Sequence, residues 1–337
     1  MNLTVCPSLL LSNFRTYSPK ARKQLFDGVK MSHMLPFLHQ DIRRSAFTLA
    51  GENRPRLSIS GAQEKYSLIS EHTELRLPVL GERTQYILKP VPSDLDNPTD
   101  VPANEHLTMQ LAGQVYGIAT AINGLLFFAN GEAALLVRRF DVQSDGSKRR
   151  QEDFASLSGR TKQLAGPDFK YEGSYEQIAR LMQQHLPAAR VEIEKFFRLV
   201  LFNYLFSNGD AHLKNFSILE TTDGDFLLSP AYDLINTSLH VNDHDMALKD
   251  GLFADDYATR GSEVYGYYIF DDFLEFGLRI GMMEKRIRQQ MTPFQQDQPQ
   301  VRALIGRSFL SEAGKATYLA SYASRLQRLN YSLEKHL

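Results

Sequence analysis

Residues 207–216 read Ser-Asn-Gly-Asp-Ala-His-Leu-Lys-Asn-Phe, and they follow directly on a segment, residues 192–206, that is apolar almost all round. Such a segment predicts a buried helix. The stretch after it places Asp210, His212, Lys214 and Asn215 within six residues. Because the burial of polar and ionisable groups costs free energy, a cluster of them at the end of a buried helix indicates a functional site.

The spacing of Asp210 and Asn215 indicates the chemistry of this site. An Asp followed five positions later by an Asn is the arrangement of kinase catalytic loops, in which the Asp accepts the proton of the substrate hydroxyl and the Asn binds magnesium. Lys214 can neutralise charge on the transferring phosphoryl group. Asp233 follows the strand-like residues 225–228 and is the candidate for the second oxygen ligand of the magnesium ion. The sequence therefore predicts Asp210 as the catalytic residue and Asn215 and Asp233 as metal ligands.

Each of these features also has a simpler interpretation. Residues 208–210, Asn-Gly-Asp, are typical of a turn that ends a helix, and the Asp-to-Asn spacing also arises by chance. His212 taken alone is typical of a structural histidine.

A candidate phosphate-binding turn lies at residues 57–65, which read Leu-Ser-Ile-Ser-Gly-Ala-Gln-Glu-Lys. The backbone N–H groups of such a turn can hold phosphate oxygens, because its small side chains do not block the approach. The stretch matches neither a Walker loop nor G-x-G-x-x-G, and a plain hairpin is the alternative.

Lys89 lies in the apolar run 86–90 and is the candidate for the lysine that grips the α and β phosphates. Glu105, on the next predicted helix, is its candidate ion-pair partner, and a solvated lysine at a strand end is the alternative. Residues 135–140, Leu-Leu-Val-Arg-Arg-Phe, lie where two lobes would join and could hydrogen-bond an adenine through their backbone.

The order of the predicted elements indicates an α+β protein with two lobes and a crevice between them. Short strands are expected over residues 57–61, 65–70, 74–79, 85–90, 123–129 and 133–140, with a hairpin at Asn130-Gly131. Helices are expected over residues 101–116, 175–184, 191–207, 271–290 and 315–333. We therefore predict a strand-rich N-lobe over residues 1–138 and a mostly helical C-lobe over residues 139–337.

Composition sets wider limits. The 337 residues are 43% hydrophobic and 23% charged, and 38 basic residues nearly balance 39 acidic ones, so the whole chain is not an electrostatic nucleic-acid binder. The one cysteine, Cys6, cannot form an internal disulfide, which fits a reducing compartment. No stretch approaches the ~20 apolar residues that span a bilayer, and the first residues lack a basic leader. We expect a cytoplasmic enzyme of bacterial type that makes no membrane contact.

Taken together, the motifs resemble the HipA family of bacterial serine/threonine kinases, the toxins of type II toxin–antitoxin systems. They occur in the family's order over residues ~55 to ~235. The matching segments are Ser-Ile-Ser-Gly-Ala-Gln-Glu-Lys (58–65), Ile-Leu-Lys-Pro (87–90), Asn-Glu (104–105), Val-Arg-Arg-Phe-Asp (137–141), Gln-Glu-Asp (151–153), Gly-Asp-Ala-His-Leu-Lys-Asn-Phe (209–216) and Pro-Ala-Tyr-Asp (230–233).

The resemblance implies a protein-kinase-like fold, ATP and Mg²⁺ as cofactors, and Asp210 as proton acceptor. It also implies autophosphorylation of Ser58, and Ser60 offers a second hydroxyl in the same loop. A phosphate there would compete with the nucleotide phosphates, because it carries a charge near −2. The residues expected around ATP are Ser60, Gly61, Ala62, Gln63, Glu64, Lys65, Lys89, Arg138, Arg139, Phe140, His212, Leu213, Lys214 and Tyr232.

Only ~50 residues precede the candidate phosphate loop, whereas full-length HipA toxins carry a further N-terminal subdomain. The chain therefore resembles the short HipT type, for which a small HipS-like protein supplies the missing part. A helix-turn-helix HipB-like antitoxin completes that system, so DNA contact would be indirect, through the antitoxin. The family's targets are aminoacyl-tRNA synthetases, and the short type is associated with tryptophanyl-tRNA synthetase.

Three other functions remain open from the residues alone. A small-molecule kinase on the same scaffold would share Asp210, Asn215 and Asp233. A non-catalytic scaffold protein would typically lack one of the catalytic groups, and this sequence has candidates for all of them. A metal site formed by His212, His240 and His244 would need the last two on one helix face, whereas residues 240–246 have the composition of a polar loop.

Overall fold

The computed structural model describes residues 2–50, 64–93, 95–143, 145–255 and 257–333. Two helices come first, α1 Pro19–Phe26 and α2 His39–Ala50. Ser18 caps α1, since its side chain accepts a hydrogen bond from the N–H of Ala21, and Pro19 occupies the first helical position, where no N–H is needed. The sequence prediction contained neither helix.

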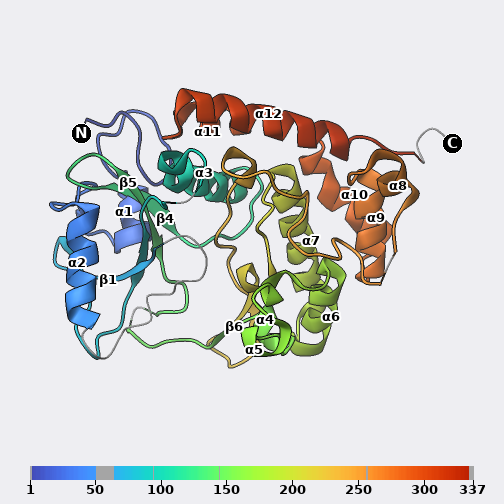
Figure 1. Ribbon diagram of the computed structural model, residues 1–337, viewed down its shortest axis with the longest axis horizontal. Coiled ribbons are helices and arrows are strands. Elements are labelled where there is room, and N and C mark those ends of the chain that lie inside the picture. The colour runs from blue at the N-terminus through green and yellow to red at the C-terminus, as the bar shows by residue number, and fades with distance from the viewer. Residues whose placement is uncertain (1, 51–63, 94, 144, 256, 334–337) are drawn as a thin grey trace.

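A five-stranded antiparallel sheet follows, with the strand order β2-β1-β3-β5-β4 (Figure 1). The predicted hairpin between β4 and β5 is confirmed, and Gly131 in its turn has a φ of 86°, which favours glycine. The strands are β1 Tyr66–Glu71, β2 Glu74–Arg76, β3 Tyr86–Lys89, β4 Asn123–Phe127 and β5 Ala133–Arg138.

Helix α3, Val101–Gln114, begins at the short turn η1, Pro98–Asp100. It packs against β4, β5 and the C-terminal helix α11, Pro299–Arg307. Every residue from Val101 to Ala112 is buried, polar ones included. The sequence predicts an amphipathic helix here, but α3 is buried over most of its length because it lies between the large sheet and the C-terminal helices (Figure 1).

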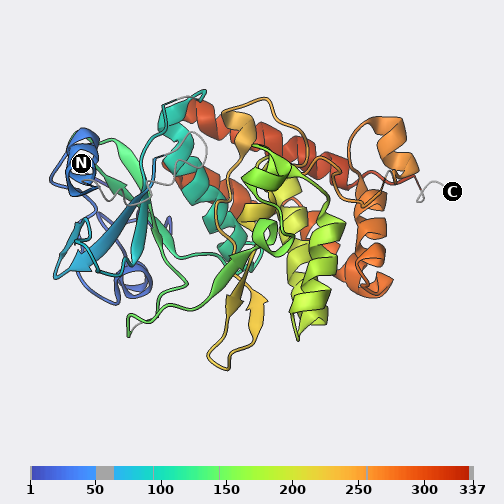
Figure 2. The ribbon, with the colours of Figure 1, turned by 60° about the horizontal axis from the view of Figure 1, so that its bottom comes forward.

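The C-terminal part is mostly helical around a small sheet of strand order β6-β7-β8, which lies between the large sheet and helices α6 and α7 (Figure 2). Its strands are β6 Gln151–Asp153, β7 Ser217–Glu220 and β8 Phe226–Leu228. The longer helices are α6 Tyr175–His185, α7 Ala189–Leu205, α9 Phe270–Arg279, α10 Glu284–Met291, α11 Pro299–Arg307 and α12 Glu312–Leu329. The short ones are α4 Phe154–Leu157, α5 Lys162–Ala165, η2 Phe169–Tyr171, η3 Leu213–Asn215, η4 Thr237–Leu239, α8 Arg260–Tyr265 and η5 Thr292–Phe294.

The prediction of one helix over residues 271–290 is wrong. Helices α9 and α10 are separate, because Gly281 between them has a φ of 88° and Met283 is extended. A residue in the left-handed region ends a helix, and glycine enters that region without a steric penalty.

Two hydrophobic clusters stabilise the chain. The smaller lies on one face of the large sheet and includes Leu25, Tyr66 and Leu136, whereas the larger runs from α3 through α7 to α12. β5 ends at Arg138, where the sequence prediction divides the lobes, but α3 belongs to the larger cluster. The division at residue 138 stays a prediction. Within the described ranges, no helix has both the length and the apolar character to cross a membrane.

Candidate functional site

A cavity of about 650 Å³ collects residues from the large sheet, α3 and the C-terminal part. Its lining includes eight of the predicted site residues: Lys65, Lys89, Asp210, His212, Lys214, Asn215, Tyr232 and Asp233. Cavities of this size are typical of small-ligand sites.

Lys89, at the end of β3, makes two ion pairs inside the cavity. Its Nζ lies 2.5 Å from Oε1 of Glu105, so the predicted pair is present, and it also donates to Oδ1 of Asp233. The side chains of Lys89 and Glu105 are only 5% and 4% exposed. Lys65 Nζ approaches the other Asp233 oxygen, Oδ2, at 3.7 Å. Two lysines and two carboxylates therefore balance one another where the sheet meets the C-terminal part.

This cluster determines the charge of Asp233. Burial acts to raise the pKa of the Asp233 carboxyl, but the attraction of Lys89 and Lys65 prevails and holds its pKa well below the usual range. Burial raises the pKa of Glu105 despite its pairing with Lys89. Desolvation acts to lower the pKa of Lys89, and the two carboxylates outweigh it and raise that pKa. Asp233 is therefore an ionised oxygen donor at neutral pH.

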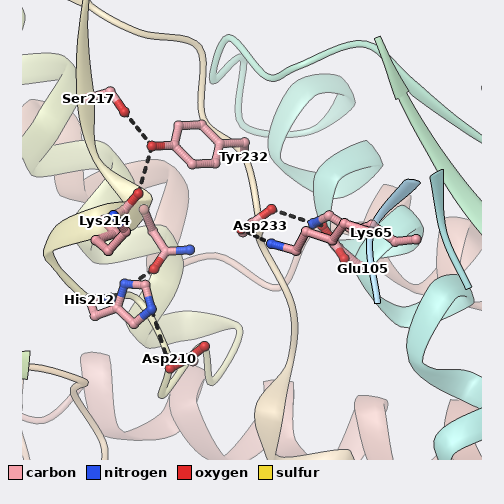
Figure 3. A network of polar contacts seen from close by, with 10 residues as sticks. Lys65, Glu105, Asp210, His212, Lys214, Ser217, Tyr232 and Asp233 are labelled. Atoms are coloured by element: carbon pink, nitrogen blue, oxygen red, sulfur yellow. Dashed lines mark hydrogen bonds and ion pairs between the residues drawn. The ribbon is translucent and has the colours of Figure 1, made fainter. Parts of the chain in front are cut away.

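Asp210 lies in the turn that follows α7. Its side chain is 47% exposed, and its Oδ1 accepts a hydrogen bond of 2.7 Å from the Tyr171 hydroxyl. His212 Nε2 lies 4.0 Å from the same oxygen (Figure 3). A half-exposed carboxylate on the wall of a cavity can receive a proton from a bound ligand.

Gly209 shows why the turn is so tight. A Cβ at this position would lie 2.7 Å from the Cβ of Asp243 and 2.9 Å from the carbonyl oxygen of His244. Any side chain would therefore collide with the segment that covers the turn. The Gly209 N–H donates to the hydroxyl of Thr237 at 2.9 Å, which ties the turn to the start of η4.

His212 is neutral at pH 7, because burial lowers the pKa of its imidazole to about 4. Its ring meets the Tyr171 ring edge-on, with centroids 5.2 Å apart. The His212 backbone N–H donates to Oδ1 of Asn215 at 3.3 Å, so the catalytic-loop candidates support one another at the start of η3.

Lys214 and Tyr232 form another wall of the cavity. Lys214 Nζ pairs with Oδ2 of Asp153 at 3.1 Å. The Tyr232 hydroxyl donates to the Lys214 carbonyl at 2.8 Å and is hydrogen-bonded to Ser217 (Figure 3). The ring of Phe140 packs on that of Tyr232, with centroids 5.7 Å apart.

Several predicted nucleotide contacts are not brought to the cavity. Arg138 makes a bidentate pair with Asp27, 2.8 and 2.9 Å, and Arg139 pairs with Asp141. The backbone N–H groups of both arginines donate to protein carbonyls. The Arg138 and Arg139 roles stay predictions.

Three other candidates also lie outside the cavity lining. Leu213 is 1% exposed and belongs to the core, and Phe140 packs on Tyr232 but does not itself line the cavity. Glu64 accepts a hydrogen bond of 2.6 Å from Tyr66 and pairs with His39. The candidates Ser58, Ser60, Gly61, Ala62 and Gln63 lie outside the described residues.

The sequence analysis assigned no role to several cavity residues, among them Asp153, Lys170, Tyr171 and Asp243. Asp153 had a signal, because it lies in the segment Gln-Glu-Asp (151–153) that resembles the HipA family. In the structure its side chain caps α4 by accepting from the Ser156 N–H at 2.9 Å. Tyr171 had none, since it lies 39 residues before Asp210.

The donor set fits a nucleotide phosphate with a hard cation. Lys65, Lys89, Lys170 and Lys214 can neutralise phosphate oxygens, and the Asp233 carboxylate and Asn215 amide offer oxygen ligands of the kind that Mg²⁺ takes. Where the structure describes the chain, no cluster of three His, Cys, Asp or Glu side chains could hold a metal. His240 is instead hydrogen-bonded to Asn104 and to the carbonyl of Asp96, both at 2.9 Å.

The chain is similar in sequence to a known protein family and to several known proteins. A family model described as HipA-like C-terminal domain matches residues 57–301. A Haemophilus influenzae protein named “Putative kinase” is 31% identical over 336 residues, covering 95% of this chain and 94% of that protein. “Putative kinase Y4mE” of Sinorhizobium fredii is 36% identical over 198 residues, covering 56% of this chain and 44% of that protein.

Solved structures show the same fold. HipA of Shewanella oneidensis, in a complex with HipB and its operator DNA, superposes with a TM-score of 0.65 at 21% identity, covering 87% of this chain and 71% of that one. The Helicobacter pylori proinflammatory kinase CtkA gives a TM-score of 0.52 at 15% identity, covering 79% of this chain and 90% of that one. The predicted α+β, kinase-like fold is confirmed, and the chain belongs to the HipA family.

Proposed function

We propose that the chain is an ATP- and magnesium-dependent serine/threonine-protein kinase, the toxin of a type II toxin–antitoxin system. The observation that carries this proposal is one cavity that joins Asp210 to the buried Lys89–Glu105 pair and to the ionised Asp233. Membership of the HipA family and the kinase names of its relatives support it.

In the proposed reaction the acceptor hydroxyl oxygen attacks the γ-phosphorus of ATP. The bond from that phosphorus to the β–γ bridging oxygen breaks, and its electron pair leaves with ADP. The proton of the hydroxyl passes to the carboxylate of Asp210, whose exposure leaves it open to an acceptor.

The other groups stabilise charge and orient the nucleotide. Asn215 and Asp233 would hold Mg²⁺, which when bound neutralises charge on the phosphate oxygens. Lys89 and Lys65, both already facing Asp233, are the candidates for phosphate contacts from the sheet side. Lys214 faces the cavity from the catalytic loop, with Asp153 holding its ammonium.

Substrate and partners extend the proposal beyond the site. We propose an aminoacyl-tRNA synthetase as acceptor, tryptophanyl-tRNA synthetase for the short type, and a cytoplasmic location. The Shewanella oneidensis complex of HipA, HipB and operator DNA supports a HipB-like antitoxin, through which DNA contact would be indirect. A HipS-like protein as further partner, the lobe division at residue 138, and autophosphorylation of Ser58 or Ser60 belong to the same proposal.

The test uses purified chain, labelled ATP and Mg²⁺ with a bacterial lysate, followed by mass spectrometry of phosphorylated peptides. Wild type should label a serine or threonine of a synthetase, and Asp210→Asn should not. Asp223→Asn, an exposed carboxylate on the turn after β7, is the matched control and should label as wild type does. Label on no protein, but on a small molecule of the lysate, would replace this proposal with a small-molecule kinase. No ATP turnover at all would favour a non-catalytic scaffold.

A further inference from the structure

Tyr171 contacts the proposed catalytic residue directly. Its hydroxyl donates to Oδ1 of Asp210 at 2.7 Å, and it ends the short helix η2 on the cavity wall. Its ring packs edge-on against His212, and the ammonium of Lys170 lies 4.8 Å from the ring centroid. The hydroxyl is thus placed by the contacts of its ring with two neighbouring residues.

The backbone around Tyr171 is also fixed from a distant segment. The Tyr171 carbonyl accepts from the Lys249 N–H at 2.9 Å, and the Gly173 carbonyl accepts from the Asp250 N–H at 3.1 Å. The Lys249 side chain pairs with Glu172. This segment therefore holds the hydroxyl at a defined place before any ligand binds.

The hydrogen bond has one possible direction. Burial and the neighbouring Asp210 carboxylate raise the pKa of the Tyr171 hydroxyl well above its usual range, so the group keeps its proton and donates a hydrogen bond to the carboxylate, which can only accept. A carboxylate has two oxygens, and among the described residues no hydrogen bond engages Oδ2 of Asp210. Tyr171 therefore occupies one oxygen and leaves the other open.

A half-exposed aspartate is otherwise free to rotate about its side-chain bonds. A general base must lie within hydrogen-bond reach of the proton that it accepts, and loss of orientation slows the reaction even where binding is intact. We infer that Tyr171 is a positioning residue for phosphoryl transfer, which holds Oδ1 of Asp210 so that Oδ2 meets the acceptor hydroxyl. The inference rests on the proposed role of Asp210.

The substitution Tyr171→Phe tests it, because the ring that packs on His212 is retained and only the hydroxyl is lost. ADP formation is measured against ATP concentration, with the wild-type chain and its matched control Tyr331→Phe, whose hydroxyl accepts a hydrogen bond from Gln327 outside the cavity lining. We expect kcat to fall about tenfold in Tyr171→Phe, as for loss of a hydrogen bond to a charged group, while the KM for ATP stays within twofold.

A double-mutant cycle separates this role from a structural one. In the Asp210→Asn background the residual rate, measured at high enzyme concentration, should not change further on Tyr171→Phe, since the hydroxyl acts through the carboxylate. A kcat that is unchanged or raised in Tyr171→Phe overturns the inference; a raised one would mean that the hydroxyl masks the base. An equal loss in both backgrounds overturns it as well. If Asp210→Asn itself turns over ATP as wild type does, the proposed function fails instead.

Discussion

Lys89 is a nearly fully buried lysine that forms ion pairs with two carboxylates, Glu105 and Asp233. We predict that Lys89→Met lowers the free energy of unfolding by about 3–5 kcal/mol, because removing one partner leaves buried charge uncompensated. Urea denaturation of the purified variant measures this loss.

The double variant Lys89→Met, Glu105→Gln is the matched comparison. It removes one positive and one negative charge, and Asp233 retains Lys65 as an ion-pair partner, with Nζ 3.7 Å from Oδ2. It should therefore be more stable than Lys89→Met alone, although both should lose ATP turnover. A double variant no more stable than the single one would show that uncompensated charge is not the cause.

The contacts of individual residues could be predicted where both the residue type and its place in an expected strand or helix indicated the same role. A lysine in an apolar strand and a glutamate on the next helix suggested the Lys89–Glu105 pair, and the pair is present. The side-chain directions of Arg138 and Arg139 could not be derived, because they depend on Asp27 and Asp141. Tyr171 could not be found at all, since only the folded chain brings it to Asp210.

Among the elements, η4 holds the turn that carries Asp210 through one side chain. The Thr237 hydroxyl donates to the Ser207 carbonyl at 3.0 Å and accepts from the Gly209 N–H at 2.9 Å. We predict that Thr237→Val, which keeps the shape but loses both bonds, lowers the free energy of unfolding by about 1–3 kcal/mol and reduces ATP turnover. Urea denaturation and ADP formation are the measurements.

The variant Thr237→Ser keeps the hydroxyl and serves as control. It should recover most of the turnover that Thr237→Val loses. Equal activities of the serine and valine variants would speak against hydrogen bonding as the reason that this threonine matters.

Elements with strong periodicity or a clear turn signal were predictable, and short ones were not. The β4–β5 hairpin and helix α7 lie close to their expected bounds, residues 123–140 and 191–207. β6 has only three residues, and its partner strand β7 begins at Ser217, 66 residues after Gln151. No local sequence pattern therefore marks β6 as a strand. The break between α9 and α10 depends on Gly281, a single residue inside a helical pattern.

For the whole molecule, buried histidines predict sensitivity to acid. Burial lowers the pKa of His106 to about 4 and that of His212 to about 4. Between that value and the unfolded pKa of about 6.5, the unfolded chain binds more protons than the folded chain. The contribution of the neutral histidines to the free energy of unfolding is therefore present above about pH 6.5 and is lost as the pH falls. For His106, which is fully buried, the loss between pH 7 and pH 5 should be about 2 kcal/mol.

His106→Gln isolates this contribution, because an amide can still donate to the Ser8 carbonyl that the imidazole contacts at 2.8 Å. Urea denaturation at pH 7 and pH 5 should show a smaller drop in the variant than in wild type, by about 2 kcal/mol. An identical drop in both proteins would assign the acid sensitivity to other groups.

Helix α3 finally bears on how such an enzyme could be switched. In many protein kinases the helix that carries the glutamate partner of the strand lysine moves to turn activity on and off. Here β4 and β5 pack against that helix on the sheet side and α11 packs against it as well, and every residue from Val101 to Ala112 is buried. Glu105 on this helix is already paired with Lys89 at the wall of the cavity, so the pair forms from contacts within the chain alone. A mechanism that switched this chain by moving α3 would therefore have to break that buried ion pair and the packing of α3 on the sheet and on α11.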